Sequence, residues 1–306
     1  MKLVSFGSVG IERPGVLQGG QILDVCAALA RRGHFGIHTM IDLISLPHWQ
    51  EILKVLIDEC LPRDWVDASG VRLGAPVPRP GKVIVIGANT YSHVAEAALV
   101  SNNEPPLEVM ALAKAGTAVV GPNDDVVRPD GARTLDYEVE LGVIIGQAVR
   151  NIPESRALEA VAGYTSVNEM SDRDMQTSSH ETNSFYRTHF LGKSYDGFCP
   201  AGPALVTLDE MGEPGDTRLR TWVNDELRQD DTLLDLVFPV ERIVSYLSKV
   251  MTLLPGDLIC TGSPAGVGAF REPLGYLEPG DTVRTDITGI GGTANLITTL
   301  ETLEPV

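Results

Sequence analysis

The hydrophobic residues of this chain fall mainly into short runs and alternations, the pattern that β-strands produce. Near the start, β-like runs at 2–6 and 20–23 are mixed with helix-like segments at 25–32 and 46–59. Further along, strands predominate, and we expect them at 82–86, 137–145, 204–207, 218–223, 257–261, 282–287 and 294–299. The pattern therefore predicts a mostly β fold with some α-helix.

A turn-rich segment at 74–81 separates these two regions. Pro76, Pro78 and Pro80 remove backbone donors and restrict φ, which favours a linker. A length of 306 residues also suits two domains of about 150 residues each. We predict a small α+β domain at 1–75 followed by a larger, mostly β domain at 76–306.

Two residues with catalytic potential follow the first strand of the larger region. Gly87 ends that strand, and Ser92 is the expected N-cap of a helix that continues to Val100. His93 and Glu96 stand three residues apart on one face of this helix, where a carboxylate can orient an imidazole. The spacing suits a general base, and a surface pair is the alternative interpretation.

Acidic and apolar residues alternate in the segment at 136–145. In a strand, Asp136, Glu138 and Glu140 would share one face. One interpretation is a half-exposed strand with an acidic outer face. The other is a metal site, because a second acidic cluster follows at 168–174 and oxygen ligands from two segments suit Mg²⁺ or Mn²⁺.

Two further features have both a functional and a plain interpretation. The glycine-rich segment at 261–268 follows an apolar strand, and such a bend can offer hydroxyl and N–H donors to a carboxylate. A simple turn explains it equally well. Lys193 is either solvated, as most lysines are, or a cation that faces the site.

Composition and charge narrow the range of functions. A hydrophobic content of 43% with 21% charged residues is typical of a globular protein. A formal charge of −17 without a Lys/Arg stripe argues against a nucleic-acid partner. The glycine-rich phosphate-binding motifs and the serine-hydrolase elbow do not occur. With four scattered cysteines, no signal-like start and no apolar run of ~20 residues, we expect a cytoplasmic protein that does not enter membranes.

Several motifs, taken in order, resemble those of the fumarylacetoacetate hydrolase family, and the resemblance covers roughly residues 81–299. The first leads into His93 and Glu96. The motifs are Ile86–Asn89, Glu138–Gly142, Asn168–Asp174, Gly192–Ser194, Trp222–Gln229 and Pro255–Gly268. The resemblance implies a rolled mixed β-sheet catalytic domain, usually in a homodimer, that binds Mg²⁺, Mn²⁺ or Ca²⁺ through three carboxylates.

The resemblance also implies a set of ligands for the cation. Glu138 and Glu140 match the paired metal ligands of the family. The third ligand falls on Glu169, where the family more often has an aspartate, and Asp172 or Asp174 is the alternative.

Other positions match residues that act on the substrate. His93 and Glu96 match the pair that deprotonates a water, and Lys193 matches the lysine that stabilises an oxyanion. The substrate-binding residues implied are Gln176, Thr261 and Gly262. The segment that follows Gln176 is expected to shape the distal pocket, where Arg187 is either a partner for a second substrate carboxylate or an exposed loop residue.

The implied substrate is a small anionic 2-oxo acid. We expect hydrolysis of a C–C bond in a 2,4-dioxo acid, either acylpyruvate-type or sugar-derived, through an enolate that the cation stabilises. Decarboxylation of a 2-oxo diacid such as oxaloacetate, or isomerisation of a 2-hydroxydienedioate, would use the same site. A metal-dependent binding protein is the non-enzymatic alternative.

Overall fold

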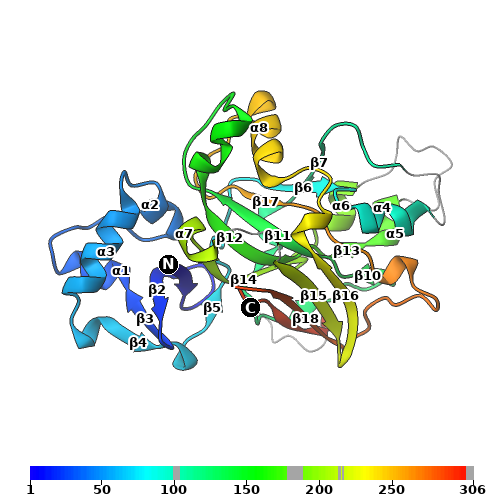
Figure 1. Ribbon diagram of the computed structural model, residues 1–306. Coiled ribbons are helices and arrows are strands. Elements are labelled where there is room, and N and C mark those ends of the chain that lie inside the picture. Colours follow the sequence, from blue (N-terminus) through cyan, green and yellow to red (C-terminus); the bar gives the residue numbers. More distant parts are fainter. Residues whose placement is uncertain (99–103, 178–188, 213–214, 216, 301–306) are drawn as a thin grey trace.

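The computed structural model describes residues 1–98, 104–177, 189–212, 215 and 217–300. A mixed sheet of twelve strands runs through the centre of the molecule (Figure 1). Its main path has the order β4-β3-β2-β1-β14-β12-β11-β17-β6-β7, with β5 beside β1 and β8 beside β14. The bounds are β1 Lys2–Phe6, β2 Arg13–Gln18, β3 Gln21–Asp24, β4 Trp65–Asp67, β5 Leu73–Gly74, β6 Val83–Gly87, β7 Met110–Lys114, β8 Val119–Val120, β11 Val139–Ile145, β12 Val161–Asn168, β14 Cys199–Val206 and β17 Leu258–Cys260.

Two smaller sheets complete the β structure. One is a two-stranded pair, and the other has five strands in the order β16-β15-β18-β19-β9. Their bounds are β10 Leu135–Asp136 with β13 Ser171–Asp172, and β9 Val126–Val127, β15 Arg218–Val223, β16 Glu226–Thr232, β18 Thr282–Ile287 and β19 Ala294–Thr298. The mixed sheets with few helices confirm the predicted fold class.

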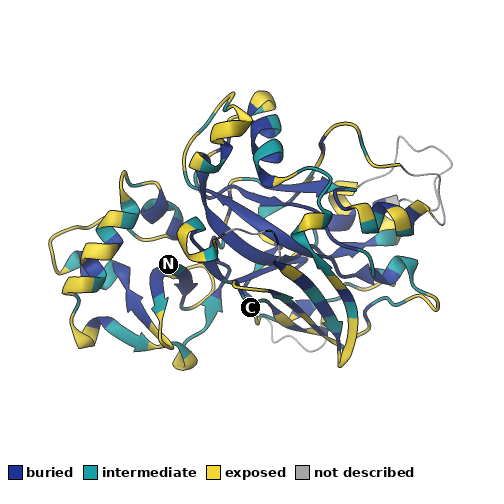
Figure 2. Cartoon of the chain, viewed as in Figure 1, coloured by how far each residue is buried: buried dark blue, intermediate teal, exposed yellow. Residues whose placement is uncertain are grey.

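The α-helices lie around the sheets, with apolar faces turned inward and polar faces exposed (Figure 2). In α8, Val240, Ile243, Val244 and Leu247 recur at the helical spacing and are buried in one core cluster. The bounds are α1 Val25–Ala30, α2 Met40–Ile44, α3 Trp49–Glu59, α4 Tyr91–Ala98, α5 Arg173–Thr177, α6 His189–Lys193, α7 Leu208–Met211 and α8 Val240–Val250.

The N-terminal strands and α1–α3 form a lobe at one side of the molecule (Figure 1). This lobe continues the central sheet, because Lys2 and Leu3 of β1 pair with Val206 and Leu205 of β14. Hydrophobic residues from both sides of residue 75 share two core clusters. The boundary between domains at residue 75 stays a prediction.

Most predicted elements match in position, and the differences are local. The strands at 218–223 and 282–287 are found with those bounds. The helix expected at 46–59 begins later, at Trp49, because His48 before it has a left-handed backbone conformation (φ 57°) that a right-handed helix does not contain. The prediction of Ser92 as the N-cap is wrong, because Thr90 provides the cap. The Thr90 carbonyl accepts a hydrogen bond from Val94 N–H, and its Oγ1 accepts one from His93 N–H. Val100 lies outside the described residues.

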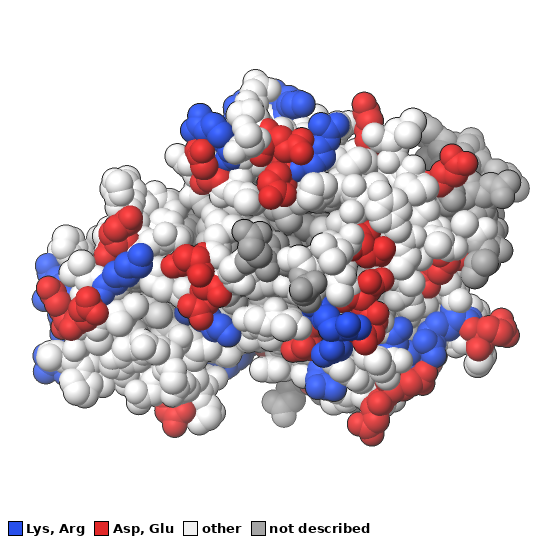
Figure 3. Space-filling model, viewed as in Figure 1, with Lys and Arg blue, Asp and Glu red and all other residues white. Residues whose placement is uncertain are grey.

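Acidic and basic side chains are interspersed on the face shown in Figure 3. That the protein does not bind nucleic acid stays a prediction. No helix in the described part of the chain combines the length and hydropathy of a membrane span.

Candidate active site

A cavity of about 690 Å³ lies where β6, β7 and α4 face the acidic strand segments. Several of the residues singled out in the sequence line it. They are His93, Glu138, Glu140, Glu169, Asp174, Gln176 and Lys193. The fold therefore brings most of the candidate residues from four separate segments to one place.

The acidic strand segment is buried rather than half exposed. Asp136, Glu138 and Glu140 expose 0%, 5% and 2% of their surfaces, and every residue of β11 is buried. The interpretation as an acidic outer face is therefore wrong. Both faces of β11 are covered, because Leu141 and Val143 on one face belong to one core cluster and Ile144 on the other face belongs to a second cluster. Buried carboxylates need partners, which the neighbouring segments supply.

Glu138 is held by two cations. Its Oε1 lies 3.1 Å from a guanidinium nitrogen of Arg173, and its Oε2 lies 3.3 Å from Nζ of Lys193. Ser171 donates a hydrogen bond to the same Oε2 at 3.3 Å. Burial acts to raise the pKa of Glu138, but the charges of Arg173 and Lys193 outweigh it and hold that pKa well below its usual value. Glu138 is therefore charged at neutral pH.

Glu140 is in the opposite electrostatic situation. Its Oε2 accepts one hydrogen bond, 2.6 Å long, from the backbone N–H of Gly262. Burial raises its pKa, and the nearby carboxylates of Glu169 and Glu138 raise it further, to well above the ordinary value. Among the described residues no cation forms an ion pair with Glu140, so the repulsion from Glu138 and Glu169 acts on it without a paired cation.

Glu169 lies between two lysines. Its Oε2 contacts Nζ of Lys193, and its Oε1 lies 2.6 Å from Nζ of Lys114. All three side chains are buried. Burial acts to lower the pKa of Lys193, but Glu138 and Glu169 outweigh it and raise that pKa. Lys193 is therefore a buried, charged group of the cavity and not a solvated surface lysine.

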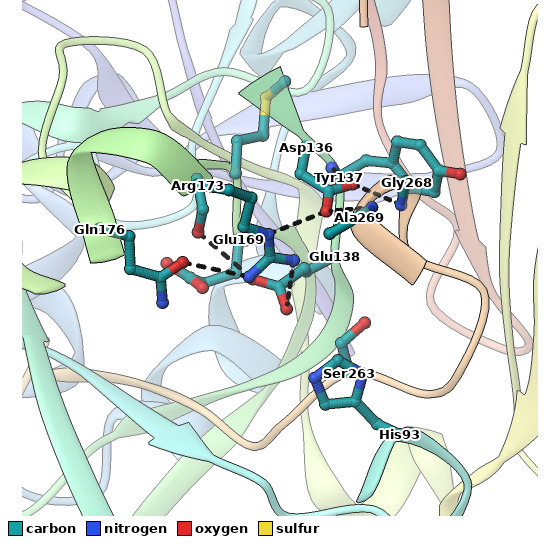
Figure 4. Close-up of polar contacts among 12 residues, drawn as sticks. His93, Asp136, Tyr137, Glu138, Glu169, Arg173, Gln176, Ser263, Gly268 and Ala269 are labelled. Atoms are coloured by element: carbon teal, nitrogen blue, oxygen red, sulfur yellow. Dashed lines mark hydrogen bonds and ion pairs between the residues drawn. The ribbon is translucent and has the colours of Figure 1, made fainter. Parts of the chain in front are cut away.

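Arg173 connects the paired carboxylates to the substrate-binding candidate Gln176. Its Nε donates to Asp136 at 2.8 Å, and its guanidinium also contacts Glu138 and Oε1 of Gln176 (Figure 4). Asp136 is fixed in turn by the backbone N–H groups of Gly268 and Ala269. This arrangement holds the guanidinium rigidly at the edge of the cavity.

The expected pair on α4 is formed. Nδ1 of His93 lies 2.7 Å from Oε1 of Glu96, and Oε2 of Glu96 accepts from the backbone N–H of Gly266 at 2.8 Å. Glu96 itself does not line the cavity, whereas His93 does. Figure 4 shows the His93 ring across the cavity from Glu138. An Nδ1–H donated to Glu96 leaves Nε2 as the ring's proton acceptor.

Thr261 and Gly262 are not among the residues that line the cavity. Thr261 is fully buried and its Oγ1 has no hydrogen-bond partner among the described residues. The N–H of Gly262 is taken by Glu140. Of the two alternative ligands, Asp172 accepts from Thr134 Oγ1, and Asp174 lines the cavity. The substrate-binding roles and the ligand set stay predictions.

Three features of the site were missed in the sequence. Lys114 carried no signal, because a single lysine after alternating apolar residues is typical of an exposed strand end. Arg173 was present in a motif but received no role. Asp136 was grouped with the possible metal ligands, whereas it fixes Arg173. Arg187 lies outside the described residues.

The donor set fits a hard divalent cation. Glu138, Glu140 and Glu169 offer only oxygen, and Oε1 of Glu169 takes no aligned hydrogen bond from a described residue. The repulsion that raises the pKa of Glu140 is what a cation would relieve. In the conformation described, Lys193 occupies the space between two of these carboxylates, and no group of three His, Cys, Asp or Glu side chains among the described residues converges as a metal site.

Comparison with known proteins defines the class of this chain. Residues 82–298 match the model of the fumarylacetoacetate (FAA) hydrolase C-terminal domain, which covers more than half of the sequence. The chain belongs to the fumarylacetoacetate hydrolase family, whose enzymes are mostly hydrolases or isomerases. The resemblance in the motifs is confirmed.

Three similar proteins show the range of activities. The 2,4-didehydro-3-deoxy-L-rhamnonate hydrolase of Sphingomonas sp. is 36% identical over 293 residues, 95% of this chain and 94% of that protein. Human oxaloacetate tautomerase FAHD2A, mitochondrial, is 38% identical over 229 residues, 75% of this chain and 70% of that protein. The crystal structure of maleylpyruvate hydrolase from Sphingobium sp. SYK-6 with manganese(II) ion and pyruvate has a TM-score of 0.76 and 31% identity, covering 98% of this chain and 99% of that one.

A Lys114→Met variant should unfold at a lower temperature than the native chain. The substitution leaves Glu169 without one of its cations and removes the donors to the carbonyls of Met170 and Phe198. Breaking a buried pair in this way costs about 3–5 kcal/mol, which in a chain of this size lowers Tm by roughly 6 °C or more. Differential scanning calorimetry measures the shift. Arg156→Met, which breaks an exposed pair with Glu159, is the control and should move Tm by no more than about 2 °C; equal shifts would contradict the role given to Lys114.

Proposed function

We propose that this enzyme hydrolyses the C–C bond between the acyl group and the pyruvate part of a 2,4-dioxo acid, with a divalent cation as cofactor. The observation that carries the proposal is the cavity itself. It has a His93–Glu96 pair on one side and, facing it, three buried carboxylates with Lys193. A base aimed at a cation site is what the attack of water on an activated carbonyl requires.

The proposed ligands of the cation are Glu138, Glu140 and Glu169, because a cation bound by these three carboxylates would relieve their mutual repulsion. A Mg²⁺ or Mn²⁺ ion held there would supply Lewis-acid stabilisation of the negative charge that develops on the substrate. The manganese in the related maleylpyruvate hydrolase supports this choice.

The protein's own groups carry the proton and position the substrate. His93, held by Glu96, accepts a proton from water through Nε2 as the water oxygen adds to the distal carbonyl. The C–C bond then breaks, and its electron pair passes to the pyruvate fragment as an enolate. The products are a carboxylic acid and, once a proton returns to carbon, pyruvate. Lys193 is the ammonium group available to stabilise the oxyanion.

The first test follows the loss of the enol ultraviolet absorbance of simple acylpyruvates in the presence of Mg²⁺ or Mn²⁺. Metal-dependent loss is expected, and Glu138→Ala should abolish it because that change removes one of the carboxylates shared by the cation site and Lys193. No loss with the native enzyme would reject hydrolysis of acylpyruvates.

The likeness to human oxaloacetate tautomerase favours a second candidate, in which the site acts on the enol or the CO₂ group of a 2-oxo diacid. Neither reaction needs a hydrolytic water. His93→Ala separates the two candidates, since hydrolysis should fall by about 10²-fold or more when the base is removed, whereas CO₂ release from oxaloacetate should fall less. Glu96→Gln, which alters only the group that orients His93, should lower hydrolysis in the same direction by a smaller factor. Equal losses in both reactions would contradict this distinction.

A further inference from the structure

One wall of the cavity is an apolar face of the β6–β7 ribbon. In this antiparallel pair Val85 lies opposite Leu112, and Gly87 lies opposite Met110. Directly opposed residues point to the same side and the side-chain period of a strand is two, so these four positions share one face. All four line the cavity, together with Val94 and Ala97 of α4.

This face leads from the carboxylates to the surface. The next pair on it is Val83 with Lys114, and Lys114 contacts Glu169. Along β7 the exposure rises from buried Lys114 through partly buried Leu112 to Met110, which is 44% exposed. Four residues of strand span about 13 Å, enough for a pyruvate unit and several further carbon atoms.

The charges along this route disfavour a second carboxylate on the substrate. Lys193 and Arg173 are the Lys and Arg residues among the described lining, and both are ion-paired with buried carboxylates. Glu104 and Asp174 also line the cavity and add negative charge. Against this apolar wall a distal carboxylate would lose its water without gaining an unpaired Lys or Arg from the described lining residues.

We propose that the acyl end of the substrate is uncharged and apolar, and that it lies along the β6–β7 face with Leu112 and Met110 as specificity-determining residues. The natural substrate class is then an aliphatic or aromatic acylpyruvate with a single carboxylate. This inference rests on the proposed hydrolase function and adds the identity of the group that is released as the carboxylic acid.

The wild-type enzyme provides the first test. kcat/KM is measured for acetyl-, butanoyl- and hexanoylpyruvate. It is also measured for a 2,4-dioxo diacid, which has the same chain length as hexanoylpyruvate but ends in a second carboxylate. We expect kcat/KM to rise by about threefold to fourfold per added methylene, and the diacid to fall at least ~10-fold below its length-matched monoacid. A flat series, or a preference for the diacid, would overturn the inference while leaving hydrolysis intact. No turnover of any compound would instead reject the proposed function on which it rests.

Two variants locate the determinant. Leu112→Ala should reduce the hexanoyl-to-acetyl ratio of kcat/KM by about 10-fold, because it removes apolar contact deep in the face. Met110→Lys changes an exposed side chain at the outer end, so it tests the same face without disturbing the core, and it should raise the diacid-to-monoacid ratio by about 10-fold. Leu107→Ala is the matched control: Leu107 is 95% exposed and absent from the lining, so both ratios should stay at the native values. Unchanged ratios in Met110→Lys would place the acyl group elsewhere.

Discussion

Replacing Lys193 with methionine should lower kcat for acylpyruvate hydrolysis by about 10²-fold or more at saturating Mn²⁺. Lys193 is buried, its ammonium contacts Glu138, Glu169 and Ser171, and the residue lines the cavity. Donors preorganised around a developing oxyanion in a site that excludes water typically contribute factors of this size. Methionine keeps the length and apolar volume of the side chain, so the loss reports the charge.

Stopped-flow or steady-state kinetics with the enol absorbance measures this effect. Because removing the ammonium also leaves two carboxylates without a cation, the folded state of the variant is checked by circular dichroism with the metal present. Lys249→Met, at an exposed position of α8, controls for a change of net charge. A Lys193→Met enzyme with kcat within threefold of native would show that the oxyanion is stabilised by another group.

Replacing Glu140 with glutamine should weaken Mn²⁺ binding by at least ~10²-fold and remove the proton that binding releases. Burial, Glu169 and Glu138 together hold the pKa of Glu140 well above 4.5, so this carboxyl keeps its proton to a higher pH than an ordinary glutamate does before the cation binds. A ligand must be deprotonated, so metal affinity rises with pH and binding releases protons at pH values between 4.5 and the raised pKa of Glu140. Isothermal titration calorimetry in two buffers of different ionisation enthalpy gives both Kd and the number of protons.

The same raised pKa predicts how stability depends on pH without metal. The folded state keeps the proton of Glu140 above pH 4.5 and the unfolded chain does not, so the free energy of unfolding falls as pH rises from about 4.5 through the raised folded-state pKa. Glu140→Gln removes this dependence and should raise Tm of the metal-free protein at neutral pH by about 2 °C or more. Glu159→Gln changes an exposed glutamate, so it should neither remove the pH dependence of stability nor raise Tm. Proton release that persists in Glu140→Gln would assign the proton to another group.

Local features of the site were accessible from the sequence because they depend on near neighbours. A helix fixes the spacing of residues three apart, so the His93–Glu96 contact follows from the pattern once α4 forms. The alternation at 218–223 likewise sets a strand whatever lies beside it. The order of the motifs was enough to place the chain in its family.

The sequence by itself thus determined the class of fold, most strands, the spacing within α4 and the identity of the clustered carboxylates. Only the tertiary structure decided that β11 is covered on both faces, that Gly266 fixes Glu96, and that Lys114 and Lys193 enclose Glu169. It also placed the apolar face of β6–β7 in line with those carboxylates. The physical reason is range: periodicity reports which side chains share a face, whereas burial and ion pairing depend on segments far apart in the chain, and packing alone brings those together.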